Sequence, residues 1–214
     1  MTRPPVTRLL FVRHGESHHS LDGVIGGPEG CRGLTDRGRA QAGAVGLSLA
    51  GRLGGTAAAV YSSVLPRAVE TADAIGAALG TAPVQHCGLC TWHLPPHADG
   101  MRTAEFQDSH AAGGGGVFRP FEHGNETWAE LVARTGSAIT EIAQRHAGGT
   151  AVLVGHSETV ESSFHVLGGQ PLYRAFDLKV APASVTEWST DGDPSAWPPA
   201  RWTLHCCGGA EGAG

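Results

Sequence analysis

The strongest constraint on this chain is a set of short apolar runs, each bounded by turn-forming residues. Residues 7–12, 57–62 and 150–155 have apolar or β-branched side chains at most positions, and residues 83–86 predict a shorter strand. Strands that are apolar on both faces are typical of parallel sheets, because helices cover both sides of such sheets. We therefore expect a mostly parallel sheet at the centre of the fold.

A helix is predicted between the first two of these strands. Thr35 is a suitable N-cap, and the glycines at 54–55 are suited to end the helix. The spacing of Ala40, Ala44 and Leu47 predicts that these three side chains share its buried face.

Further helices are predicted at residues 65–79, 128–148 and 159–167, and the second of these has the most regular apolar face. Late strands are predicted at residues 185–188 and 202–206. Strands and helices thus alternate along most of the chain.

This alternation predicts an α/β fold, a three-layer sandwich with a mostly parallel central sheet and helices on both faces. A single domain over residues 1–214 is the simplest organisation. Residues 92–124 have no periodicity and are rich in Gly and Pro, so we expect a lid or insert with at most one helical turn. The tail at residues 208–214 is expected to be flexible.

Composition excludes several classes of function. The formal net charge of -5 argues against a nucleic-acid-binding module. No run of 18 or more apolar residues predicts a membrane span, and the first ten residues lack the apolar core of a signal peptide. We expect a cytoplasmic protein.

The five cysteines include a C-x-x-C pair, Cys87 and Cys90, followed by His93 and His97. These four residues could ligate a metal, but a structural zinc site usually needs a second such pair, and prolines interrupt this stretch. We interpret the cysteines as reduced, buried or half-buried thiols and assign no metal and no cofactor.

The chemistry-bearing residues follow the strong strands. Arg13 and His14 follow the first, Arg67 comes shortly after the second, and His156 follows the strand at 150–155. Ligands of open parallel sheets bind at the carboxyl ends of the strands, so we expect these four side chains to meet there. Guanidinium forks match phosphate oxygens, and a neutral imidazole is a nucleophile that nearby arginines keep unprotonated.

The segment Arg13-His14-Gly15-Glu16 resembles the RHG signature of the histidine phosphatase superfamily, in its phosphoglycerate mutase-like branch. Three later segments are similar to other motifs of that family. Residues 34–42 read L-T-x-x-G-x-x-Q-A, and residues 62–72 contain the pattern S-x-x-x-R-x-x-x-T-A. The third segment is residues 154–156. The resemblance covers the chain up to about residue 167. It implies that His14 is the phosphate-accepting nucleophile and that Arg13, Arg67 and His156 clamp the phosphate.

The resemblance also implies which residues line the substrate pocket. Asn125, Glu126 and Thr127 resemble a family segment that lies beside it. Ser20 stands where many relatives have a phosphate-binding asparagine, and Glu161 is a further candidate. His18 and His19 are expected at the pocket rim.

The general acid is the main departure from the family. Many relatives have a glutamate in an L-x-E segment, where this chain has Leu89-Cys90-Thr91, and threonine cannot deliver a proton at neutral pH. Four carboxylates could replace it: Asp99, Glu105, Glu122 and Glu126. We favour Glu105 because it lies in the expected lid.

The resulting hypothesis is a metal-independent phosphatase that hydrolyses a small phosphorylated metabolite through a phosphohistidine on His14. A phosphomutase is one alternative. A second is reuse of the fold for phospho-ligand binding or biosynthetic acid/base chemistry, which the threonine at position 91 keeps open. A homodimer is compatible with the sequence.

Overall fold

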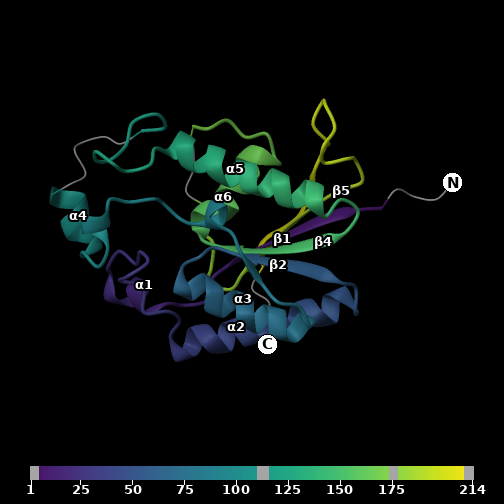
Figure 1. The fold of residues 1–214 in the computed structure, drawn as a ribbon, viewed down its shortest axis with the longest axis horizontal. Coiled ribbons are helices and arrows are strands. Elements are labelled where there is room, and N and C mark those ends of the chain that lie inside the picture. The colour runs from purple at the N-terminus through teal and green to yellow at the C-terminus, as the bar shows by residue number, and fades with distance from the viewer. Residues whose placement is uncertain (1–4, 110–115, 174–177, 210–214) are drawn as a thin grey trace.

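One mixed sheet organises the molecule in the computed structural model, which describes residues 5–109, 116–173 and 178–209 (Figure 1). The strand order is β3-β2-β4-β1-β5-β6. The first four strands in this order run parallel, and β5 and β6 pair antiparallel at one end. The strands are β1 (Thr7–Arg13), β2 (Ala58–Ser62), β3 (Val84–Gln85), β4 (Thr150–Gly155), β5 (Val185–Thr190) and β6 (Thr203–Gly209).

Helices cover both faces of the sheet, which confirms the predicted α/β sandwich. In Figure 1, α2 (Asp36–Leu53) and α3 (Pro66–Leu79) lie below the sheet, and α5 (Trp128–Arg145) and α6 (Ser157–Val166) lie above it. The shorter elements are α1 (His18–Asp22), η1 (Cys87–Leu89), η2 (Pro96–Ala98) and α4 (Thr103–Ser109).

The alternation of side chains along β1 explains why this strand is apolar throughout. Leu9 and Phe11 enter the core beneath α5 and α6, whereas Leu10 and Val12 enter the core formed with α2 and α3. All four side chains are fully buried, because each face of the strand meets a helical layer.

The predicted buried face of α2 is wrong. Ala40, Ala44 and Leu47 are exposed, and the helix instead buries Gly38, Ala42, Val45, Gly46, Leu49 and Leu53. Alanine and glycine occur on both sides of this helix, so its apolar periodicity is weak. Close packing against α3 selects the face, since a Cβ at Gly46 would lie only 3.0 Å from the carbonyl oxygen of Ala74.

The expected lid and tail differ in part from the sequence interpretation. The segment 92–124 contains η2 and the seven-residue helix α4, which is more regular structure than one turn. Its residues 110–115 lie outside the described residues. Strand β6 continues to Gly209, so residues 208–209 belong to the sheet because they extend its pairing with β5, whereas residues 210–214 are not described.

Gly15 and Gly38 allow two backbone segments to approach closely beside the end of β1. A Cβ at Gly38 would lie 1.9 Å from the carbonyl oxygen of Glu16, and a Cβ at Gly15 would lie 2.5 Å from that of Gly38. The same junction is held by Thr35, whose side chain caps α2 by accepting from the Gly38 N–H at 3.0 Å. These contacts place the loop after β1 against the N-terminus of α2.

We expect Gly38→Ala to destabilise the fold by at least about 2 kcal/mol, because the new methyl group meets rigid backbone. Gly43→Ala is the matched control in the same helix, since a Cβ there has no neighbour within 4 Å. That control should be neutral or stabilise by about 0.5–1 kcal/mol through its helix propensity. Urea unfolding of both variants measures the difference, and equal midpoints would contradict the close approach.

Among the helices in the described part of the chain, none combines the length and the apolar character needed to cross a bilayer.

Candidate active site

The ends of three neighbouring parallel strands form the base of the site. The backbone N–H of His14, just after β1, donates to the Gly155 carbonyl at the end of β4 at 2.9 Å. The N–H of Ser63, just after β2, donates to the Val154 carbonyl at 2.9 Å. These bonds continue the sheet beyond its strands and bring the loops after β1, β2 and β4 to one edge, as predicted.

Two imidazoles and one guanidinium meet at this edge. The ring centroids of His14 and His156 lie 5.2 Å apart. Arg67, in the first turn of α3, donates from Nε to His14 Nε2 at 3.2 Å, and its Nη2 lies 3.3 Å from His156 Nδ1. The chain thus brings together residues that are up to 142 positions apart in sequence, from 14 to 156.

Hydrogen bonds fix which nitrogen of each ring carries the lone pair. His14 Nδ1 lies 2.7 Å from the Gly15 carbonyl, which can only accept, so Nδ1 carries the proton and Nε2 the lone pair. His156 Nδ1 faces the Arg67 donor, so its Nε2 carries the proton and donates to Ser63 Oγ at 2.9 Å. The lone pair of His14 Nε2 accepts from Arg67 Nε.

Both rings are held in the neutral form. Burial, and then the charge of Arg67, hold the pKa of His14 well below its usual value of 6.5. The same two causes, in the same order, hold the pKa of His156 well below 6.5. At neutral pH Nε2 of His14 is therefore unprotonated.

Arg67 is a buried cation with 3% exposure, and no carboxylate in the described part of the chain forms an ion pair with it. Its Nη1 donates to the Gly26 carbonyl at 2.7 Å and contacts Cys31 Sγ at 3.3 Å. A buried guanidinium without a protein anion favours an anionic ligand, because burial of an uncompensated charge is costly.

Arg13 adds a second cation beside the first. Its Nη1 donates to the Val180 carbonyl, whereas its buried Nε has no hydrogen-bond partner among the described residues. Burial lowers the pKa of Arg13, the charge of Glu158 raises it and the charge of Arg67 lowers it. The electrostatic influence of Arg67 on Arg13 and on both histidines indicates one shared site of positive potential.

Thr71 lies one turn after Arg67 in α3, and its hydroxyl makes two hydrogen bonds to backbone groups. Its Oγ1 donates to the Arg67 carbonyl at 2.7 Å and accepts from the Gly15 N–H at 3.1 Å. This hydroxyl therefore joins the loop that carries His14 to the helix that carries Arg67.

A cavity of about 710 Å³ opens beside these groups, and Arg67 reaches it. Its walls come from the loop around residues 19–29 and from the segment 87–96, with Asp99 and Thr103. Apolar side chains such as Val24, Ile25 and Leu94 form much of the lining. A small organic molecule would fit beside the cationic base.

His19 and Ser20 line this cavity. The ring of His19 lies 6.0 Å from that of His14, and burial followed by the charge of Arg67 lowers its pKa to about 4. Ser20 is exposed, and its hydroxyl lies 3.0 Å from Ser17 Oγ. His19 thus adds a third neutral imidazole beside the cavity, whereas His18, also expected at the rim, is not among the lining residues.

Comparison with protein-family models decides what kind of protein carries this geometry. Residues 9–202 match the model of the histidine phosphatase superfamily (branch 1). The chain belongs to this superfamily. The motifs at residues 13–16, 34–42, 62–72 and 154–156 lie within the matched region.

Solved structures of other histidine phosphatase-like folds agree with this assignment. A mycobacterial glucosyl-3-phosphoglycerate phosphatase complexed with VO3 is 24% identical, with a TM-score of 0.76 over 93% of this chain and 97% of that one. YhfR of Bacillus stearothermophilus is 23% identical, with a TM-score of 0.77 over 94% and 96%. A phosphoserine phosphatase mutant from Entamoeba histolytica, in complex with phosphoserine, is 21% identical, with a TM-score of 0.72 over 96% and 98%. No curated protein matches this chain.

Most of the carboxylates expected as general acid candidates have other partners. Asp99 accepts from the backbone N–H groups of residues 27, 29 and 30 at 2.7–3.0 Å. Glu126 forms an ion pair with Arg134 at 2.8 Å, and Glu122 lies 3.0 Å from His97 Nε2. Glu105, the favoured candidate, is exposed on α4 and is not among the residues that line the cavity.

The cavity is not lined by the remaining residues expected at the pocket: Asn125, Glu126, Thr127 and Glu161. Asn125 is buried and donates to the Glu126 carbonyl at 2.6 Å, and Thr127 caps α5 in a reciprocal arrangement with Glu130. Glu161 is buried within α6, one turn beyond its start. Glu126 supports the wall indirectly, because its carboxylate accepts from the His93 backbone N–H at 3.2 Å.

The sequence interpretation did not consider Glu158 as a general acid. It lies in the first turn of α6, two residues after His156, and its Oε2 accepts from Thr91 Oγ1 at 3.0 Å. Its charge also acts on Arg13. Its position just after His156, at the end of β4, was the sequence signal that could have identified it.

Proposed function

We propose that this histidine phosphatase superfamily member is a metal-independent phosphomonoesterase that works through a phosphohistidine on His14. The observation that carries the proposal is the convergence of His14, His156 and the unpaired Arg67 at one sheet edge. The two arginines supply the positive charge that a phosphoryl group requires.

In the first step, the lone pair of His14 Nε2 attacks phosphorus and the bond from phosphorus to the ester oxygen breaks. The leaving oxygen takes the electron pair of that bond and receives a proton from a general acid. Arg67 donates to the non-bridging oxygens and the Nε–H of Arg13 shares their charge, while His156, whose one ring N–H donates to Ser63 Oγ, orients the Arg67 guanidinium through Nδ1.

In the second step, water attacks the phosphohistidine and the bond from phosphorus to Nε2 breaks, which returns the electron pair to His14. The deprotonated general acid takes the proton of the water. The products are an alcohol and inorganic phosphate, and the site returns to its starting state.

We assign the general acid to Glu158. The resemblance to the family expects a glutamate at position 91, and here the hydroxyl of Thr91 instead holds the carboxylate of Glu158 at 3.0 Å. Thr91 lines the cavity, and Glu158, although not itself among the lining residues, lies within hydrogen-bond distance of Thr91, and its charge acts on Arg13. A threonine and a glutamate from two segments thus replace one glutamate.

Glu158→Gln should lower kcat about 10²–10³-fold on alkyl phosphates, because their leaving oxygen needs a proton. The loss on p-nitrophenyl phosphate should be much smaller, since nitrophenolate leaves without protonation. Glu105→Gln distinguishes the two assignments. A leaving-group-dependent loss in Glu105→Gln, with normal rates in Glu158→Gln, would transfer the role to Glu105.

The substrate class proposed is a small phosphorylated metabolite. The cavity of about 710 Å³ would hold a compact organic group next to the phosphate site. The distant structural neighbours include proteins in complex with phosphoserine, 3-phosphoglyceric acid and VO3.

Turnover of a panel of small phosphomonoesters by the full chain tests the function. Release of inorganic phosphate that continues after treatment with a chelator is the expected result. Formation of a positional isomer of the substrate would indicate a phosphomutase instead. Binding of phosphate without turnover of any ester would favour a non-catalytic or repurposed site.

A further inference from the structure

A second cluster of reactive side chains lies at the same cavity as His19. Cys87, Cys90 and His93 each offer one potential ligand atom, and these atoms all lie within 4.8 Å of one another. All three residues line the cavity. Both cysteines are free thiols.

Two of the three distances within this cluster match those of a tetrahedral zinc site. Zinc–sulfur bonds of about 2.3 Å and zinc–nitrogen bonds of about 2.0–2.1 Å imply edges of about 3.8 Å between two sulfurs and about 3.6 Å between sulfur and nitrogen. Cys87 Sγ lies 3.8 Å from Cys90 Sγ and 3.6 Å from His93 Nε2. The third pair, Cys90 Sγ and a ring nitrogen of His93, lies within 4.8 Å.

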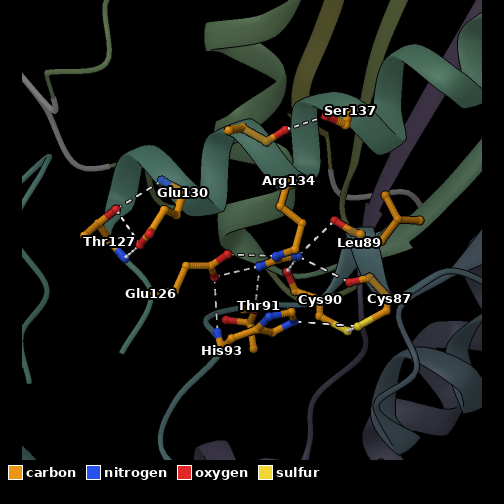
Figure 2. A network of polar contacts seen from close by, with 12 residues as sticks. Cys87, Leu89, Cys90, Thr91, His93, Glu126, Thr127, Glu130, Arg134 and Ser137 are labelled. Carbon is orange, nitrogen blue, oxygen red and sulfur yellow. Dashed lines mark hydrogen bonds and ion pairs between the residues drawn. The ribbon is translucent and has the colours of Figure 1, made fainter. Parts of the chain in front are cut away.

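The backbone around the cluster is held by one side chain, Arg134 of α5 (Figure 2). Its guanidinium donates to the carbonyls of Cys87, Gly88, Cys90 and Thr91 at 3.1–3.3 Å. It also forms two bonds of 2.8 Å with Glu126, whose carboxylate accepts from the His93 N–H. Both thiols and the imidazole are therefore positioned by a single network, a feature that metal sites require.

We propose that Cys87, Cys90 and His93 form a three-ligand site for Zn²⁺ or a similarly thiophilic divalent cation. A donor set of two sulfurs and one imidazole nitrogen selects such ions over Mg²⁺ and Ca²⁺. The fourth coordination position borders the cavity, where water or an oxygen atom of a bound ligand can occupy it. This proposal is independent of the proposed phosphatase activity, and no step of that mechanism uses the metal.

Cobalt titration of the full-length chain tests the site. The protein is reduced, stripped with a chelator, and titrated with Co²⁺, whose visible spectrum reports tetrahedral geometry and whose near-ultraviolet band reports thiolate ligation. We expect one equivalent of Co²⁺ to bind with both signatures and Zn²⁺ to displace it. Substitution of residues that only support metal ligands already lowers metal affinity about 10–100-fold. Loss of a ligand itself, in Cys87→Ser or His93→Gln, should therefore weaken Co²⁺ binding about 100-fold or more.

Cys207→Ser is the matched control, because Cys207 is an exposed thiol outside the cluster. It should bind Co²⁺ like the wild type. Cys87 and His93 are both exposed, so their substitutions leave the core intact and keep the test interpretable if Cys90→Ser fails to fold. Three results would overturn the proposal: a thiolate band absent from the reduced wild type, an unchanged band in Cys87→Ser, or mass spectrometry showing Cys87 and Cys90 joined as a disulfide under the reducing conditions of the assay.

Discussion

His14→Ala should reduce kcat/KM by about 10⁵-fold, because the covalent route through Nε2 is lost and only phosphate binding remains. The fold should survive, since the imidazole makes one hydrogen bond to its own loop and one to Arg67. Steady-state release of inorganic phosphate measures the loss. The variant should still bind vanadate, because Arg13, Arg67 and His156 are unchanged.

Trapping of the intermediate separates this role from a structural one. Brief reaction with a radiolabelled phosphomonoester, followed by denaturation at alkaline pH, should leave acid-labile label on the wild type and none on His14→Ala. His205→Ala is the control, because His205 is exposed on β6 and bonds only to Ser189 in the described contacts. Label that persists in His14→Ala would rule out His14 as the nucleophile.

Arg67→Ala should reduce kcat/KM by about 10³–10⁴-fold and should raise KM as well as lower kcat. Arg67 contacts both imidazoles, and charge stabilisation by an arginine at a phosphoryl group has effects of about this size. Unlike His14→Ala, this variant should lose vanadate binding. Arg67→Lys should recover part of the activity, since it restores the charge without the planar fork.

The pH profile gives a second measure of the same residue. The Arg67 charge lowers the pKa of His14 and His156, second only to burial, so its removal raises both pKa values. Since His14 acts unprotonated, the acid limb of kcat/KM should move to higher pH in Arg67→Ala. Arg145→Ala, an exposed substitution on α5, should leave the limb in place. An unmoved limb in Arg67→Ala would show that burial alone sets the protonation of His14.

The local chemistry of the site could be predicted because it follows strand ends. Arg13, His14, Arg67 and His156 each stand a few residues beyond a strong apolar run, and parallel strands align their carboxyl ends. The glycines and threonines of the motifs could be recognised but not explained. The structure explains the glycines by the close backbone approach at Gly15 and Gly38, and the threonine by the hydrogen bonds of the Thr71 hydroxyl. Both features depend on contacts between segments that are distant in sequence.

The buried face of α2 could not be predicted, because alanine and glycine on both sides give weak periodicity and the partner helix decides. The sequence also did not indicate Glu158, the carboxylate that we propose as the general acid. Glu105 was favoured for its place in a loop, whereas the contact between Thr91 and Glu158 joins residues 67 positions apart. Sequence spacing carries no information about such a pair.

The alternating order of strands and helices, the apolar core of the sheet and the arginine and histidine residues at its edge all follow from the sequence. Each of these features depends on local sequence pattern and on the geometry of parallel strands. Only the folded chain brings Glu158 to Thr91 and gathers Cys87, Cys90 and His93. These outcomes depend on how loops from distant segments pack and on one arginine, Arg134, that holds four carbonyl groups in place.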